Sequence, residues 1–300
     1  MAMVEERGFT DRLVDIILYI VLTLLSLACL LPFLNVVSIS LSGFTPVSAN
    51  EVWFWPIQFN LDNYGFIIAD EIFVHSFGVS VLRVLVGVSL SLLVMVVTAY
   101  PLSRDNIYMP GRTIFKTLMI FGMMFSGGLI PYFLSLRNLG LLNKFAVLVI
   151  PSALNIFNSI LIINYFRGIP PELYESAVLD GANHFQVLFR IFLPLSTPVL
   201  ATVTLFSAVG HWNSWFDGLI YLKDASQWPL QSYLYTRVTN RMLQWNVSGG
   251  AERAGFLYEQ ATPEGLQAAM IMIATIPIIL VYPALQRYFV TGLTLGAIKE

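Results

Sequence analysis

Ionisable side chains are scarce in this sequence, and several of them crowd into one passage, residues 172–195. The passage reads ELYESAVLDGANHFQVLFRIFLPL, with two glutamates, an aspartate, a histidine and an arginine between apolar runs. Such groups act as acids and bases only when a nucleophile, a base and an orienting group stand together. The few serines near histidines lie in apolar segments without a supporting carboxylate. The sequence therefore predicts no catalytic residues, and the passage favours docking over catalysis.

Metal and nucleotide sites find no support in the sequence. The three histidines, His75, His184 and His211, are scattered without the cluster of ligands that a metal site requires, so structural roles are favoured. The one cysteine, Cys29, lies inside an apolar run and can form no disulfide or thiolate cluster within the chain. The phosphate-binding pattern GxxxxGK[ST] does not occur, so ATP would have to be bound by another polypeptide.

Composition indicates an integral membrane protein. The 300 residues are 57% hydrophobic and 11% charged, whereas an ordinary soluble domain has about 45–50% and about 25%. A bilayer core of about 30 Å requires about 20 apolar residues per helix. Six stretches meet this requirement, at residues 13–41, 77–102, 114–136, 145–166, 195–222 and 267–289. The net charge of -2 and the lack of basic runs argue against nucleic acid as a partner.

The distribution of lysine and arginine predicts the orientation in the membrane. The loop of residues 43–74 contains neither residue type, whereas the opposite side collects a set of basic residues. That set is Arg7, Arg12, Arg104, Arg112, Lys116, Arg167, Arg190, Arg287 and Lys299. By the positive-inside rule both termini face the cytoplasm, and so does the 172–195 passage. The first apolar run is too long for a signal-peptide core and is interpreted as a retained anchor.

Outside the predicted spans, two segments are long enough to have structure of their own. One is residues 43–76, where Trp53, Trp55 and Tyr64 suit an aromatic belt at the membrane interface. The other is residues 223–266. Membrane lipid is therefore an expected partner of the chain.

The 172–195 passage predicts a short helix, a tight turn and a second helix. The prolines at 170–171 favour a helix start, and Glu172 and Glu175 in the first turn suit the helix dipole. Gly181 supplies a stop, and a second helix follows from about Asn183. A helix of this kind could simply lie among lipid headgroups, and from these physical features alone that interpretation stays open.

The apolar face of the first helix is predicted from helical spacing. Leu173, Ala177 and Val178 recur at three-to-four residue spacing and share one side. We expect this side to be the apolar one.

The spacing of this passage resembles the cytoplasmic signature of ATP-binding-cassette importer permeases. That signature is Glu-Ala-Ala, three residues, Gly, nine residues, Ile-x-Leu-Pro, and the chain has it from Glu175 to Pro194 with Ser176 for one alanine. The resemblance implies an all-α membrane protein of the type I importer permease fold, with six transmembrane helices and a cytoplasmic coupling helix within residues 170–194. It implies ATPase docking at Glu172, Glu175, Ser176, Ala177, Asp180, Gly181 and Ala182.

Other stretches resemble the carbohydrate branch of these permeases. They include AYPLSR, HWNSWFDGLIYL and the terminal VTGLTLGAIKE. The resemblance implies a permease subunit of the bacterial inner membrane, a single permease domain over residues 1–300, carrying oligosaccharides or polysaccharide fragments. Its implied partners are a second homologous permease, two ATPase subunits that bind ATP and Mg, and an extracytoplasmic solute-binding protein. The rival class is a nucleotide-independent channel or secondary transporter, which six spans would fit equally well.

Polar residues in the fifth predicted span are candidates for the translocation path. Asp217 lies beside Trp212, Asn213 and Trp215, and an ionisable group at membrane depth costs about 2.5–3.5 kcal/mol on insertion scales. It should therefore face protein or water, either lining a sugar path or joining two helices. Arg83, near the outer end of the second span, is expected to extend toward the interface rather than to attract an acidic sugar.

Overall fold

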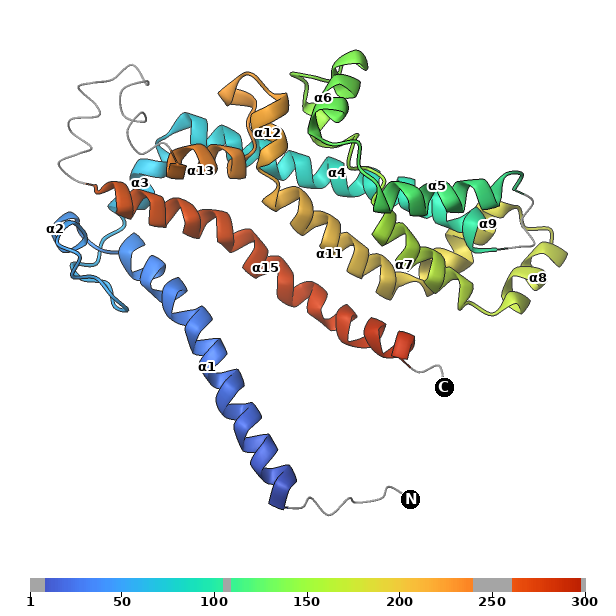
Figure 1. The fold of residues 1–300 in the computed structure, drawn as a ribbon, viewed down its shortest axis with the longest axis horizontal. Helices are drawn as coiled ribbons and strands as arrows, with labels where there is room; N and C mark the ends of the chain where they lie inside the picture. The colour runs from blue at the N-terminus through green and yellow to red at the C-terminus, as the bar shows by residue number, and fades with distance from the viewer. Residues whose placement is uncertain (1–8, 105–108, 240–260, 298–300) are drawn as a thin grey trace. The chain divides into compact units, whose positions relative to one another are not determined.

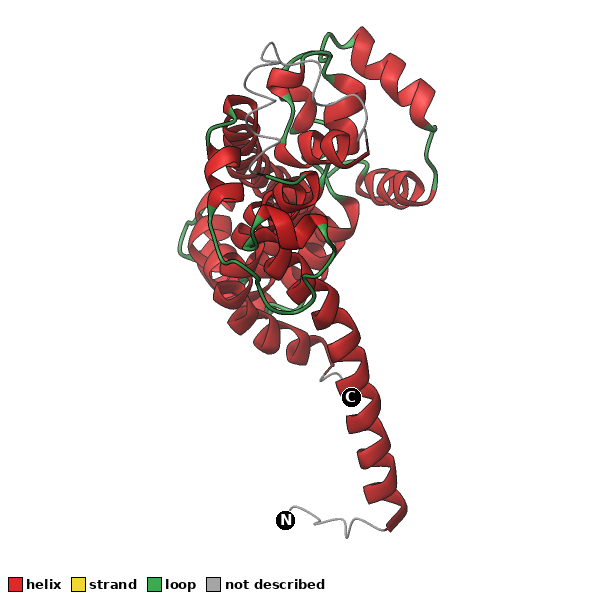
Figure 2. Cartoon of the chain, turned by 90° about the vertical axis from the view of Figure 1, so that its left-hand side faces the viewer, coloured by secondary structure: helices red, strands yellow, loops and turns green. Residues whose placement is uncertain are grey.

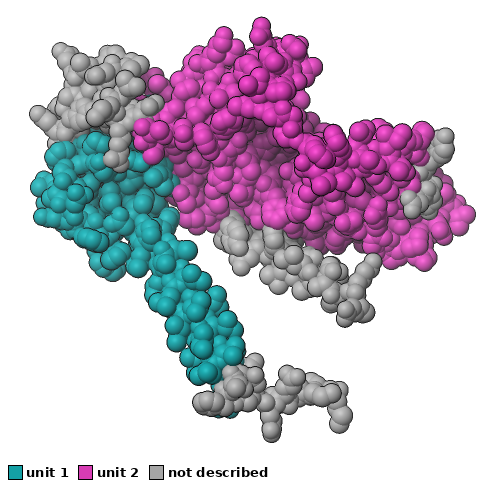
Figure 3. All heavy atoms as spheres, viewed as in Figure 1, with its two compact units in different colours: residues 1–70, 240–273 teal, residues 71–239, 274–300 magenta. Residues whose placement is uncertain are grey.

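The computed structural model describes residues 9–104, 109–239 and 261–297. Within these ranges helices are joined by loops and turns, and no strand is present (Figure 2). The all-α prediction is confirmed. Two compact units divide the chain, residues 1–70 with 240–273 and residues 71–239 with 274–300 (Figure 3).

The first unit is built around one long apolar helix. Its elements are α1 (Phe9–Ser40), α2 (Phe44–Ser48), α3 (Asp62–Ile68) and the first part of α15 (Pro263–Ala297) (Figure 1). The apolar stretch of α1 is left unburied by the chain itself. A helix that is apolar on all sides and exposed in this way is typical of a membrane span.

The second unit is organised around α4 (Glu71–Ser103), which packs against α7 (Ile156–Arg167) and α11 (Thr197–Asn213). Small residues on the buried side of α4, among them Ser80, Gly87 and Ser91, let these helices approach closely. At Gly87 the space is filled by a neighbour, since a Cβ atom there would lie 2.6 Å from the imidazole ring of His211. Close packing of α4 and α11 therefore depends on this glycine.

The remaining elements of the second unit are short. They are α5 (Arg112–Met124), α6 (Leu129–Asn138), the 3-10 helix η1 (Phe145–Leu148), α8 (Pro171–Leu179), α9 (His184–Val187), the π-helix η2 (Leu188–Phe192), α10 (Leu193–Leu195), α12 (Phe216–Tyr221), the 3-10 helix η3 (Ala225–Gln227) and α13 (Leu230–Thr239).

Three helices in the described residues are long and apolar enough to cross a membrane. They are Arg12–Ser40 in α1, Glu71–Ser103 in α4 and Pro263–Val281 in α15, at the places of the first, second and sixth predicted spans. A fourth would be the pair His184–Leu195 and Thr197–Asn213, which is bent by 82°. The predicted fifth span, residues 195–222, is interrupted because α11 ends at Asn213 and α12 begins at Phe216.

The predicted third and fourth spans are not single long helices. Residues 114–136 are divided by the turn of residues 125–128, where Gly128 has φ of 82°. Residues 145–166 contain η1 and then α7, which starts only at Ile156 behind its N-cap Asn155. At 1.5 Å per residue α5 and α7 each reach about 20 Å or less, short of a bilayer core of about 30 Å. Six spans in one domain over residues 1–300 thus stay a prediction.

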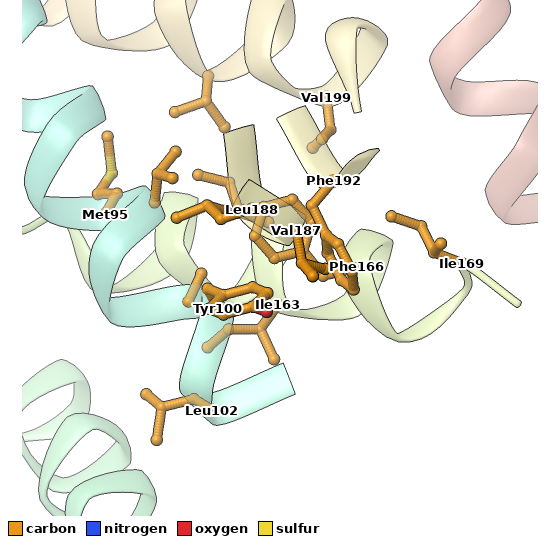
Figure 4. Close-up of a cluster of buried hydrophobic side chains, with 14 of the residues drawn as sticks. Met95, Tyr100, Leu102, Ile163, Phe166, Ile169, Val187, Leu188, Phe192 and Val199 are labelled. Atoms are coloured by element: carbon orange, nitrogen blue, oxygen red, sulfur yellow. The ribbon is translucent and has the colours of Figure 1, made fainter. Parts of the chain in front are cut away.

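A buried cluster at one end of α4 joins this helix to α7, α8, α9, η2 and α11 of the second unit. Figure 4 shows Phe166 of α7 and Phe192 of η2 close together, with Tyr100 of α4 beside them. The three rings meet edge to face, with centroids 5.1 Å apart for Tyr100 and Phe192 and 5.3 Å apart for Phe166 and Phe192. Such aromatic pairs contribute about 0.5–1.5 kcal/mol beyond their buried area. The cluster holds α8 and α9 against the ends of α4 and α7.

Candidate functional site

The predicted docking segment has the expected helix, turn and helix. Helix α8 begins at Pro171 and is followed by Asp180 as its C-cap. Gly181 adopts φ of 80°, and its N–H donates to the carbonyl of Val178 (3.0 Å) while the N–H of Ala182 donates to the carbonyl of Ala177 (2.9 Å). These two bonds form a Schellman motif, which requires a left-handed residue at this point. The predicted stop at Gly181 is confirmed.

The second helix of the segment begins where the sequence places it. Asn183 is the N-cap of α9, and its side chain accepts a hydrogen bond from the N–H of Gln186 (2.9 Å). The Gln186 side chain accepts in return from the N–H of Asn183 (2.9 Å). This capping box satisfies two backbone donors that the helix start would otherwise leave unpaired. The turn between α8 and α9 is therefore defined on both sides by local bonds.

Helix α8 packs on the chain through a residue outside its predicted apolar face. Tyr174 is buried and its ring stacks on His184, whereas Leu173 and Val178 of the predicted face are exposed. The ring of Tyr174 packs in the buried cluster at the end of α4, so much of the predicted apolar face is left on the surface. Ala177 agrees with the prediction, because it is half-buried against the cluster.

The segment therefore presents a mixed acidic and apolar outer surface. Of the predicted docking residues, Glu172, Glu175, Ser176, Asp180 and Gly181 are exposed, whereas Ala177 and Ala182 are half-buried. Large apolar side chains are exposed beside them, at Leu173, Val178, Leu179, Phe185 and Phe189. Among them, the exposed fraction of Leu179 reaches 88%. Exposed apolar side chains that gather on one short segment are typical of a protein interaction site.

A buried arginine ties the segment to the end of α4. Arg104 donates from Nη2 to the backbone carbonyls of Phe166 (3.2 Å) and Ile169. Its guanidinium also lies 5.1 Å from the ring centroid of Phe192, a cation–π contact. Burial lowers the pKa of Arg104, and the nearby Tyr100 and Glu172 oppose this shift. Arg104 thus caps the end of α7 and holds η2 against it.

The buried Arg83 of α4 forms an ion pair with Asp217 in the first turn of α12, directly after the break that follows α11. Arg83, only 2% exposed, pairs through both guanidinium nitrogens with the Asp217 carboxylate, and its Nη1 also donates to the carbonyl of Ser214 (3.2 Å). Asp217 Oδ1 accepts further bonds from the Ser214 hydroxyl and the Gly218 N–H, both at 2.9 Å. The expectation that Arg83 extends to the membrane interface is wrong. Arg83 binds the Asp217 carboxylate instead of extending to the lipid–water interface, because this carboxylate lies close enough for a bidentate ion pair.

The other predicted path residues separate into two environments. Trp212 is buried, donates from its indole N–H to the carbonyl of Ala274 (3.0 Å) and packs edge to face on Phe77. Asn213 is exposed, and Trp215 is partly exposed with its ring stacked on Tyr235 at 4.0 Å between centroids. Asp217 keeps a 21% exposed side chain. A role in a path stays a prediction for all four, and their surroundings favour it for Asn213, Trp215 and Asp217.

Metal ligands are not grouped in the described ranges. No three histidine, cysteine, aspartate or glutamate side chains within residues 9–104, 109–239 and 261–297 stand close enough to hold an ion.

Comparison with known proteins identifies the family of the chain. Residues 1–294 match the family described as binding-protein-dependent transport system inner membrane component. The polygalacturonan/rhamnogalacturonan transport system permease protein YtcP of Bacillus subtilis is 38% identical over 96% of this chain and 99% of its own length. The protein LplC of Bacillus subtilis is 39% identical over 90% and 89% of the two chains.

A solved structure has the same fold. A crystal structure of a bacterial ABC transporter involved in the import of the acidic polysaccharide alginate contains a chain that matches with a TM-score of 0.87 and 34% identity, over 94% of this chain and 98% of that one. The expected type I importer permease fold is thereby confirmed. The chain belongs to the family of inner membrane permease components of binding-protein-dependent transport systems.

Proposed function

We propose that this chain is one of two permease subunits of an ATP-driven importer of the bacterial inner membrane, with both termini in the cytoplasm. The second permease would complete the translocation path, and two ATPase subunits would bind ATP and Mg. A solute-binding protein would deliver the cargo from outside. The family description supports the dependence on a binding protein.

We infer that the cargo is an oligosaccharide fragment of an acidic polysaccharide. The names of two relatives support this, since one transports polygalacturonan or rhamnogalacturonan and the other imports alginate. The exposed Asn213 amide and the partly exposed Trp215 ring are suited to sugar hydroxyls and sugar faces respectively.

The observation that carries the ATP-coupled mechanism is the outer surface of α8 and α9. This surface combines exposed apolar side chains with the acidic Glu172, Glu175 and Asp180, and it turns sharply at Gly181. A projecting acidic and apolar surface of this kind is suited to a cleft in the ATPase that supplies arginine side chains as partners. The ATPase pair would move α8 and α9 on binding ATP, and the aromatic cluster with Arg104 would transmit the motion to α4 and α7. Alternating access follows if ATP and the loaded binding protein each favour one of the two states.

A nucleotide-independent transporter finds less support. In that class Asp217 would be a coupling-ion site, which requires a carboxylate that can exchange its partner for the ion. Here both carboxylate oxygens are bonded to Arg83.

The docking proposal is tested at Gly181. A Cβ at this position meets nothing within 4 Å in the chain, so bulk can be added without a clash at the Cβ atom, although the φ of 80° strains any residue that carries a side chain. Gly181→Trp should abolish co-purification of the ATPase and ATP-dependent uptake, while membrane insertion persists. Gly181→Ala is the matched control, because alanine brings the same strain of a left-handed backbone without the bulk. Retention of the ATPase by Gly181→Trp would refute docking at this turn.

A further inference from the structure

Large aromatic side chains stand exposed in the loop of residues 52–59, which follows α2 in the first unit. Trp53 is 67% exposed, Trp55 82% and Phe59 65%. Exposed apolar groups of this size, gathered in one loop, mark a surface that meets another apolar phase. Tyr64, which the sequence groups with these tryptophans, is instead half-buried with its hydroxyl 2.8 Å from Ser40 Oγ.

Hydrogen bonds fix the loop to the end of α1. The Asn35 side-chain amide donates to the carbonyls of Val52 (3.2 Å) and Trp53 (2.8 Å). The N–H of Gly43 donates to the carbonyl of Ile57 (3.1 Å), and the N–H of Ile57 donates to Ser42 Oγ (3.0 Å). These hydrogen bonds therefore fix the level along the α1 axis at which the aromatic side chains of the loop lie.

The position of Asn35 along α1 gives the depth of the loop relative to the membrane. The uninterrupted apolar stretch of α1 starts at Ile16, directly after Asp15, and 19 residues at 1.5 Å each place Asn35 about 29 Å further along the axis. An average tilt of about 20° lowers this to about 27 Å. The hydrocarbon core is about 30 Å thick, so Asn35 lies within about 3 Å of its boundary when Ile16 lies at the other one. Trp53, bonded to Asn35 through its backbone, is then at the depth where tryptophan is enriched in membrane proteins.

The charge of the region indicates how it meets lipid. Residues 43–74 contain no lysine or arginine, and their ionisable groups are the acidic Glu51, Asp62, Asp70 and Glu71. Attraction of basic residues to anionic headgroups therefore plays no part. Aromatic rings with a polar edge prefer the headgroup boundary without any such attraction.

From these observations we propose that the loop of residues 52–59 is a lipid anchor. Trp53, Trp55 and Phe59 insert among phospholipid headgroups at the membrane surface nearest the Ser40 end of α1. The anchor fixes the depth of α1, which the chain itself leaves unsupported along its apolar length. The proposal depends on α1 crossing the membrane and is independent of ATPase docking.

Spin labels on single cysteines test the anchor in the full chain. The native Cys29 is exposed on α1, about 9 Å closer to the membrane centre than Asn35, and serves as a depth reference. A Cys29→Ser background then carries either Trp55→Cys or the control Ala225→Cys, which lies at the start of the exposed 3-10 helix η3 of the second unit. Each label is read in phosphatidylcholine nanodiscs, with and without phosphatidylglycerol, for relaxation by oxygen and by a water-soluble nickel chelate. The readings are repeated in the complex with cysteine-free partner chains.

The expected ratio of oxygen to nickel accessibility at Trp55→Cys lies between the hydrocarbon value at Cys29 and the aqueous value at Ala225→Cys. It should be the same in both lipid compositions. A ratio equal to that at Ala225→Cys would overturn the anchor. Low accessibility to both reagents at Trp55→Cys would also overturn it, since the ring would then be covered by protein. An aqueous reading at Cys29 would overturn both the anchor and the membrane span of α1.

Discussion

The Arg83–Asp217 pair predicts unequal effects of removing its two members. Asp217→Asn keeps the shape of the side chain but leaves the guanidinium of Arg83, 2% exposed, without a counter-charge. Breaking a buried pair in this way costs about 3–5 kcal/mol in the free energy of unfolding. Arg83→Met should cost less, on the order of 2 kcal/mol, because the partly exposed carboxylate keeps bonds from the Ser214 hydroxyl and the Gly218 N–H.

A double-mutant cycle measures whether the pair acts as a unit. Unfolding of the full chain in mixed micelles by sodium dodecyl sulfate, followed by tryptophan fluorescence, gives the free energies of the two single variants and the double variant. We expect the double variant to be less destabilised than the sum of the single variants by on the order of 2 kcal/mol. Additivity to within about 0.5 kcal/mol would refute the ion pair as a link between α4 and the break before α12. Equal losses in the two single variants would refute the proposed asymmetry.

Two further substitutions test the packing of the second unit by thermal unfolding in detergent. Phe192→Ala removes a fully buried ring from the aromatic cluster and should cost about 3–5 kcal/mol, whereas Phe189→Ala, at an exposed position, should leave the unfolding temperature nearly unchanged. Equal effects would show that the cluster is not packed as described. Gly87→Ala places a Cβ 2.6 Å from the His211 ring and should destabilise the chain, whereas Gly78→Ala, where a Cβ meets nothing within 4 Å, should not. An unfolding temperature for Gly87→Ala at or above that of the native chain would contradict close contact of α4 and α11.

Local signals in the sequence were sufficient for the docking segment. Pro171, Gly181 and Asn183 each act through the backbone of their own neighbours, so their effect does not depend on the rest of the fold. The structure has a helix start, a Schellman motif and a capping box at these residues. The buried face of α8 was not predictable in this way, because Tyr174 stacks on His184 of α9, whose ring in turn packs edge to face on Tyr100 of α4.

Long-range features were the harder part. Arg83 and Asp217 are 134 residues apart, and only the general rule that charges in apolar spans find partners could have linked them. Hydropathy sums over a window do not register a break of a few residues. The predicted spans therefore run without interruption across the turn of residues 125–128 and across the break at Ser214 and Trp215. The stacking of Trp215 on Tyr235 had no signal in the sequence.

The central claim is that transport through this chain is driven by ATP bound to a docked partner. The most direct measurement is uptake of labelled oligogalacturonate into vesicles that contain the chain with its co-purified partners, with and without ATP and the loaded solute-binding protein. We expect uptake only when both are present, with ATP hydrolysis stimulated by the loaded binding protein. Uptake by vesicles that contain this chain alone, without ATP, would contradict the account and favour a nucleotide-independent transporter.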